Sequence, residues 1–180
     1  TSYMEPVGIR DIVAVLACLH YLIECLGLDA GTDFDITPAE VLHASVNAMT
    51  FVWMNYIEPK VCSSETSLDG GALDRSCFDV QQSLPKRRSY GVEDDDVDYC
   101  RLLDSFTSLA VMSASLDYND IVGLRKGVPH DFANILQRIC AFKACRSLAM
   151  KEGVINILFK WMRSKDMNLE LIAANALRDL

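Results

Sequence analysis

Residues 153–180 read GVINILFKWMRSKDMNLELIAANALRDL, and they predict two short apolar helices joined by a tight polar bend. In the first helix the apolar residues recur every three or four positions, which indicates one buried face. They are Val154, Ile155, Ile157, Leu158, Trp161 and Met162. Because a hairpin of this size cannot bury its faces alone, the sequence predicts further helices stacked against it.

Local signals mark where these two helices begin and end. Gly153 suits the left-handed conformation of a helix stop. Arg163 and Lys165 stand near the end of the first helix, where cations favour the helix dipole. Asp166 is predicted to cap the second helix through its carboxylate. That helix places apolar side chains on one side, and its alanines allow close approach of a neighbour: Leu169, Ile172, Ala173, Ala176, Leu177 and Leu180.

The pattern resembles the second and third helices of an armadillo repeat. The repeat has a glycine, an apolar helix ending Leu-Leu-Arg-Ser, a bend with Asp, and then Ala-Ala-x-Ala-Leu-Arg-Asn-Leu. Here Gly153, residues 161–164, Asp166 and residues 173–180 fall on those positions, and residues 145–152 resemble the short first helix. The resemblance weakens before residue 145 and reaches back to about His130. It implies an all-α, armadillo-like α-solenoid segment of stacked helical hairpins that binds proteins.

The resemblance also implies where a partner binds, because the third helix, here residues 168–180, lines the binding face in the family. Candidates there are Asn168, Asn175 and Arg178, joined by Arg138 from an earlier helix. The chain departs from the family at Val154, Asn156 and Asp179, which replace a glycine, a proline and an asparagine. That asparagine clamps extended peptides in the family, so Asp179 argues against clamping of this kind.

Two tryptophans are the candidate aromatic anchors of a partner-binding groove. Trp53 and Trp161 are the aromatic residues that we expect to be partly exposed if such a groove exists. The helical spacing of the aromatic residues also suits packing in the core, and that alternative stays open.

Composition limits the classes of function. The 180-residue chain is 51% apolar, which is enough for a sizeable core in one domain or one solenoid segment. Its net charge is −8, with 17 acids and 6 bases (−11) in residues 1–100 and 8 acids and 11 bases (+3) in residues 101–180. An acidic chain is a poor binder of nucleic acid, whose phosphates need clustered Lys and Arg. The acidic half either attracts a basic partner or is solvated.

The seven cysteines are an odd number without a CxxC pair, and most lie in apolar runs. This usage predicts reduced thiols in a cytoplasmic protein, with the nucleus as an alternative. No signal peptide is apparent. We expect one continuous fragment of a larger protein, because the chain starts at Thr1 and an apolar helix face runs to Leu180.

Residues 1–59 predict an N-terminal helical hairpin. The apolar run 12–28 is shorter than the ~20 residues of a membrane span and contains His20 and Glu24, so a buried helix is predicted. Thr37-Pro38-Ala39-Glu40 is a capping box that starts a second helix, which we expect to stop before Pro59. The two helices are predicted to pair in opposite directions.

Residues 60–95 predict a long polar internal loop, with disorder left open for part of it. Ser89 follows three bases, residues 86–88, and is a candidate phosphorylation site. The acidic run 94–98 lacks the spacing of a calcium loop and predicts instead the start of a helix over about 97–116. Residues 96–180 then form the armadillo-like part, in which Asp131 is expected to cap a helix that bends near 141–144.

No catalytic or cofactor site is predicted. His20, His43 and His130 have no nucleophile and orienting group at suggestive spacing, and neither a zinc motif nor a phosphate-binding loop is present. The predicted function is a non-catalytic scaffold or adaptor that binds a peptide or helix of another protein, without nucleic acid or membrane partners. Two alternatives stay open: a regulatory helical region of a larger enzyme, and a bundle that self-associates through residues 11–28.

Overall fold

The computed structural model describes residues 7–26, 36–60 and 93–180, and every regular element in these ranges is helical. The all-α class predicted from the sequence is therefore confirmed. The elements are α1 (Ile9–Leu26), α2 (Pro38–Val52), the π-helix η1 (Trp53–Ile57), α5 (Glu93–Ser115), the 3-10 helix η2 (Tyr118–Asp120), α6 (Val128–Ala141), α7 (Lys143–Lys151), α8 (Val154–Met162) and α9 (Met167–Asp179).

Helix α2 starts with the predicted capping box. The Thr37 hydroxyl accepts a hydrogen bond from the Glu40 N–H at 3.3 Å, and the Glu40 carboxylate accepts one from the Thr37 N–H at 2.8 Å. Pro38 occupies the first turn, where its missing N–H costs nothing. The backbone N–H groups of Thr37 and Glu40, which would otherwise be unpaired, are thus each bonded to the side chain of the other residue.

The prediction that this helix stops before Pro59 is wrong. The backbone widens into the π-helix η1 and stays helical to Lys60, with the Glu58 N–H donating to the Trp53 carbonyl. In an α-helix the proline ring clashes with the carbonyl four residues earlier, and its nitrogen has no proton to donate. A π-turn holds one more residue than an α-turn, and this wider spacing accommodates Pro59.

Helix α5 begins at Glu93, four residues earlier than predicted, so the acidic residues 93–96 form its first turn. Carboxylates are favourable at this end of a helix, as the sequence indicated. The prediction that Asp131 caps α6 is wrong, because α6 already begins at Val128 with Gly127 at its N-cap. The predicted bend after α6 is confirmed: Phe142 is extended and separates α6 from α7.

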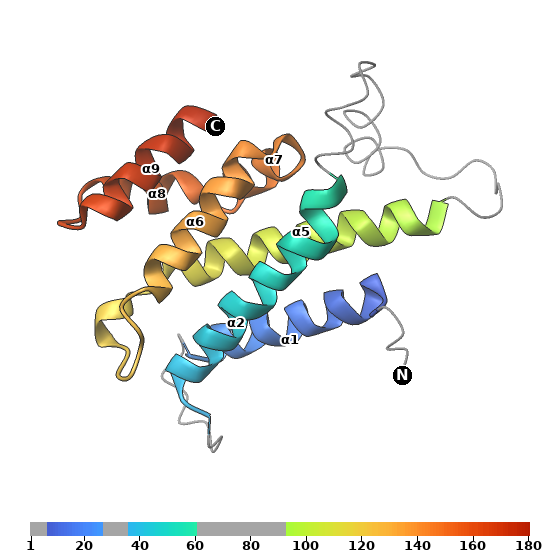
Figure 1. Ribbon diagram of the computed structural model, residues 1–180, viewed down its shortest axis with the longest axis horizontal. Coiled ribbons are helices and arrows are strands. Elements are labelled where there is room, and N and C mark those ends of the chain that lie inside the picture. Colours follow the sequence, from blue (N-terminus) through green and yellow to red (C-terminus); the bar gives the residue numbers. More distant parts are fainter. Residues whose placement is uncertain (1–6, 27–35, 61–92) are drawn as a thin grey trace.

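The helices form two layers (Figure 1). Helices α2, α6 and α9 lie next to one another in the front layer, while α1 and α5 lie behind them and α8 lies behind α9. Within the layers α1 packs on α5, α2 on α6, and α6 on α9; between them α1 pairs with α2, α5 with α6, and α8 with α9. The chain therefore runs back and forth through three stacked helical pairs, with the short α7 packed against α5 and α6.

The core lies between the layers and is continuous from α1 to α9. Helix α5 contributes Leu102, Leu103, Phe106, Leu109 and Ala110, all of them buried. On α8 the prediction of burial is confirmed for Val154, Ile157, Leu158 and Trp161, whereas Ile155 is only partly buried. Met162 is 41% exposed, so its assignment to that face is wrong.

Among the described helices, none combines the length and the apolar character that crossing a lipid bilayer requires.

Candidate protein-binding surface

The front layer carries four of the residues predicted to bind a partner. Arg138 on α6 and Arg178 on α9 are both exposed, and their helices pack side by side. Asn168 is exposed in the first turn of α9, and Asn175 is half-buried two turns later. The fold thus brings two arginines and two asparagines, predicted separately, onto neighbouring helices.

The two tryptophans do not have the predicted exposure. Trp53 is 6% exposed and Trp161 is 4% exposed. The Trp53 ring packs against Phe106, with centroids 5.9 Å apart, and meets Phe142 edge-on at 6.4 Å. These large rings contribute more by filling the space between the layers than as exposed anchors, which is the core alternative left open above.

Arg138 lies over the buried indole. Its guanidinium carbon is 5.9 Å from the Trp53 ring centroid, and one guanidinium nitrogen lies 4.0 Å from the Met54 sulfur. Arg138 itself is exposed, and a cation–π contact at an exposed site contributes about 0.5–1 kcal/mol, so this contact restrains an otherwise flexible side chain. Met54 is about half exposed beside it and adds apolar surface next to the charge.

The sequence did not identify Met54 as part of this surface. The π-turn inserts one residue into the helical register, which shifts every later side chain around the axis. Pro59 was the available signal, because a proline inside a helical pattern forces a stop or a distortion upstream.

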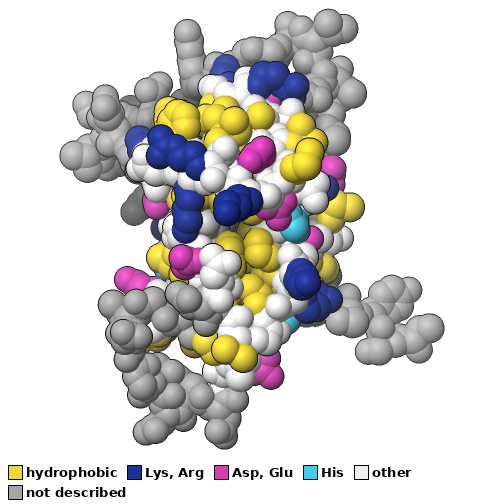
Figure 2. All heavy atoms as spheres, turned by 90° about the vertical axis from the view of Figure 1, so that its left-hand side faces the viewer, with side chains coloured by type: hydrophobic (Ala, Val, Ile, Leu, Met, Phe, Trp, Pro, Cys, Tyr) yellow, Lys and Arg dark blue, Asp and Glu magenta, His cyan; other side chains and the backbone are white. Residues whose placement is uncertain are grey.

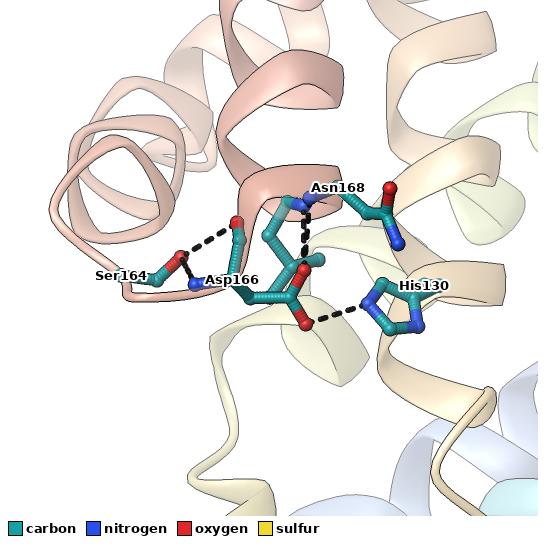
Figure 3. A network of polar contacts seen from close by, with 5 residues as sticks. His130, Ser164, Asp166 and Asn168 are labelled. Atoms are coloured by element: carbon teal, nitrogen blue, oxygen red, sulfur yellow. Dashed lines mark hydrogen bonds and ion pairs between the residues drawn. The ribbon is translucent and has the colours of Figure 1, made fainter.

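A polar network fixes the start of α9 against the start of α6 (Figure 3). The His130 ring nitrogen Nε2 lies 2.7 Å from the Asp166 carboxylate oxygen Oδ2. The other carboxylate oxygen, Oδ1, accepts hydrogen bonds from the N–H groups of Asn168 at 2.9 Å and Leu169 at 3.3 Å. The Ser164 hydroxyl accepts the N–H of Asp166 at 3.3 Å. Asp166 therefore caps α9 as predicted, and it also joins α9 to α6.

The electrostatics of Asp166 follow from these contacts. The hydrogen bond from His130 lowers the pKa of the Asp166 carboxyl, and the backbone N–H groups of Leu169 and Asn168 lower it further. Partial desolvation acts in the opposite direction but is outweighed. The carboxylate is thus held in its charged form, which both caps the helix and attracts the imidazole.

Two further histidines contact polar groups. His20 Nε2 lies 3.3 Å from the Ser108 hydroxyl, and His43 Nε2 lies 3.5 Å from the backbone nitrogen of Arg125. In the described part of the chain, no carboxylate bonds to either ring. Nucleophilic catalysis needs a third group to orient the base, so neither pair forms a triad. The described residues also contain no group of three or more His, Cys, Asp or Glu arranged to hold a metal ion.

Several predicted features lie outside the described residues: Ser89, the bases 86–88 and most of the predicted loop 60–95. Five cysteines are described, and three of them are free thiols: Cys18, Cys25 and Cys140. Burial raises the pKa of the Cys140 thiol to about 11. Such a thiol stays protonated at neutral pH and is unreactive.

A second exposed region, formed by apolar side chains, lies on α8 and α9. These are the last two helices of the chain, and α1 is the first. Phe159 and Met162 on α8 are 50% and 41% exposed, and Met167 and Leu171 on α9 are also exposed. A shallow hollow of about 470 Å³ on α8 is lined by Asn156, Phe159, Lys160 and Arg163. In Figure 2 the upper part of the molecule shows apolar side chains gathered among Lys and Arg.

Comparison with known proteins finds no matching family, no matching curated protein and no matching solved structure. The armadillo resemblance of residues 145–180 therefore stays a prediction.

Proposed function

We propose that the chain is an armadillo-like α-solenoid segment that acts as a non-catalytic scaffold or adaptor. It binds a peptide or helix of another protein across the surface formed by α2, α6 and α9. The observation that carries this proposal is the layered order of the helices, in which three consecutive pairs stack so that α2, α6 and α9 lie side by side (Figure 1). Extended surfaces of this kind are what repeat proteins use for binding.

Matched positions on α6 and α9 support a repeat. Arg178 follows Arg138 by 40 residues (178 minus 138), and buried Ala173 follows buried Ala133 by the same interval. An interval of about 40 residues suits helical repeats of the armadillo type. The 40-residue interval thus matches an exposed arginine with an exposed arginine, and a buried alanine with a buried alanine, on two helices that pack together.

The chemistry of this surface favours an acidic partner. Arginine presents a planar fork of donors that matches a carboxylate in two parallel hydrogen bonds. Arg138 is already oriented by Trp53, while Arg178 contacts the neighbouring Asp179 at 3.3 Å and remains 72% exposed. The apolar surface of Met54 lies beside Arg138. We therefore expect an acidic segment that carries an apolar side chain.

We further propose that the protein has no enzymatic activity of its own and functions in the cytoplasm, with the nucleus as the alternative. Support for the first point is that the contacts of His20 and His43 lack an orienting carboxylate within the described residues. Support for the second is that Cys140 is buried as a free thiol, which suits a reducing compartment.

The test is quantitative affinity capture from cell extract, comparing the wild-type chain with the double variant Arg138→Glu/Arg178→Glu. The matched control is Arg125→Glu/Lys126→Glu, which makes the same change in charge at exposed residues before α6. We expect a partner that both the wild type and the control retain, and that the α6/α9 variant captures at least tenfold less. Circular dichroism confirms that each variant is folded.

Equal capture of every protein by all three chains would show that the α2/α6/α9 surface is not the binding surface. All four substituted side chains are exposed, and the circular dichroism of each variant separates a loss of binding from a loss of folding.

A further inference from the structure

Two helices of the back layer carry stripes of exposed or partly exposed apolar side chains. In α1 the stripe consists of Ala14, Val15, Cys18 and Tyr21, all exposed, with Val15 at 52% and Tyr21 at 63%. It lies on the side of the helix opposite the buried residues Ile12, Leu16, Leu19 and Ile23. We call it the α1 stripe.

The second stripe lies on α8 and consists of Ile155, Phe159 and Met162, spaced four and three residues apart. Phe159 and Met162 are 50% and 41% exposed, and Ile155 is partly exposed. We call it the α8 stripe. Helix α5 packs against both α1 and α8, so the two stripes belong to opposite ends of one layer.

The charges beside the two stripes have opposite signs. Asp11 and Glu24 are exposed next to the α1 stripe, while the nearby Arg10 pairs with Asp98 of α5 at 2.7 Å. Lys160 and Arg163 are exposed next to the α8 stripe, and within the described residues neither forms an ion pair. Over the whole chain the same asymmetry holds, with −11 in residues 1–100 and +3 in residues 101–180.

We propose that the α1 stripe of one copy docks on the α8 stripe of a second copy, joining copies head to tail. Both stripes are apolar and their flanking charges are complementary, so this contact brings acids to bases. The two symmetric alternatives are disfavoured, because α1 against α1 places acids opposite acids and α8 against α8 places bases opposite bases. The contact requires none of the α2/α6/α9 surface and is therefore independent of the proposed function.

The geometry has consequences for the form of the assembly. A head-to-tail contact leaves one free stripe at each end, so further copies can add, and the product is an open chain rather than a closed dimer. A single pair of helical stripes covers less than the ~1,200 Å² of a stable interface. Association is therefore weak, and its extent grows with protein concentration.

Two variants that each block one stripe test the proposal by analytical ultracentrifugation. Val15→Arg places a cation in the α1 stripe, facing Lys160 and Arg163, and Phe159→Glu places an anion in the α8 stripe. The wild type is expected to grow in mass with concentration above the monomer value of 20.1 kDa. Each variant alone is expected to remain a monomer, with association weakened at least tenfold. An equimolar mixture is expected to form only a 1:1 dimer, because one intact stripe of each kind is present.

Phe51→Glu is the matched control, since Phe51 is 51% exposed on α2, nearly equal to Phe159. It is expected to assemble like the wild type. A second pair of exposed sites, Cys18→Arg and Met162→Glu, repeats the test in case a variant fails to fold by circular dichroism.

Three outcomes overturn the proposal: a wild type that stays monomeric over the whole concentration range, folded variants whose mixture stays monomeric, or Phe159→Glu that still dimerises alone. The last result would indicate a symmetric contact through α1. Each of them leaves the capture experiment on Arg138 and Arg178 unaffected, so the two proposals succeed or fail separately.

Discussion

Replacing Ala176 by leucine tests the close approach of α9 to its neighbours. Ala176 is fully buried, and α9 packs on both α6 and α8. The substitution adds three carbon atoms at a position that is already completely buried. On the same helix Ala174 is exposed, so Ala174→Leu makes the same chemical change without a packing cost.

The expected loss follows from overpacking. Additional methylenes in a packed core cost about 1–3 kcal/mol of unfolding free energy. For a chain of this size each kcal/mol lowers Tm by about 2–4 °C, so a loss near 2 kcal/mol lowers it by about 4–8 °C. Leucine and alanine have similar helix propensities, and Ala174→Leu is expected to stay within about 0.5 kcal/mol of the wild type.

Urea unfolding followed by circular dichroism gives the free energy, and tryptophan emission, to which buried Trp161 of this hairpin and buried Trp53 both contribute, gives a second probe. If Ala176→Leu were as stable as Ala174→Leu, α9 would not pack as described. The side-by-side placement of Arg138 and Arg178, on which the proposed binding surface depends, would then fail as well.

Three further perturbations have defined outcomes. Gly153 has a φ of 87°, so Gly153→Ala is expected to destabilise the fold by about 1–2 kcal/mol in urea unfolding. The pKa of Asp166 is lowered from its ordinary value in the fold, so its charged form stabilises the protein at neutral pH, and this contribution disappears as the pH falls through the lowered value. Removing the main cause with His130→Ala should lower the urea midpoint at pH 7, and the difference from the wild type should shrink as the pH falls through the lowered value. Burial raises the Cys140 pKa to about 11, so iodoacetamide at pH 8 should label exposed Cys18 and spare Cys140 until urea is added.

Each of these has a control. Gly127 has a φ of −78° and nothing within 4 Å of an added Cβ, so Gly127→Ala should not destabilise; equal losses at both glycines would contradict the conformational argument. An undiminished pH 7 midpoint in His130→Ala would show that the imidazole does not support the Asp166 cap. Rapid labelling of Cys140 in the native protein would mean that α6 opens readily to solvent.

Features encoded within a few residues were predicted correctly from the sequence. The Thr37–Glu40 capping box, the left-handed Gly153 and the Asp166 cap each depend on hydrogen bonds or dihedral angles that span at most three residues. The acidic first turn of α5 belongs to the same class, because the dipole acts on the nearest charges. Local physical chemistry is sufficient for such features.

Features that depend on distant residues were not predicted. His130 and Asp166 are 36 residues apart, and Arg138 and Trp53 are 85 apart (138 minus 53), so neither pair follows from helical spacing. The exposure of Met162 was also missed. Periodicity identifies the apolar side of a helix. Which residues on that side are buried depends on the neighbouring helices that pack there.

The guanidinium of Arg138 above the Trp53 ring gives the proposed binding surface an optical property. Indole emission responds to a nearby cation, and an acidic ligand that draws Arg138 away changes the surroundings of Trp53. Trp161, buried on α8, provides a second chromophore outside that contact. The chain therefore contains an intrinsic fluorescent sensor, which can screen candidate peptides without any attached label.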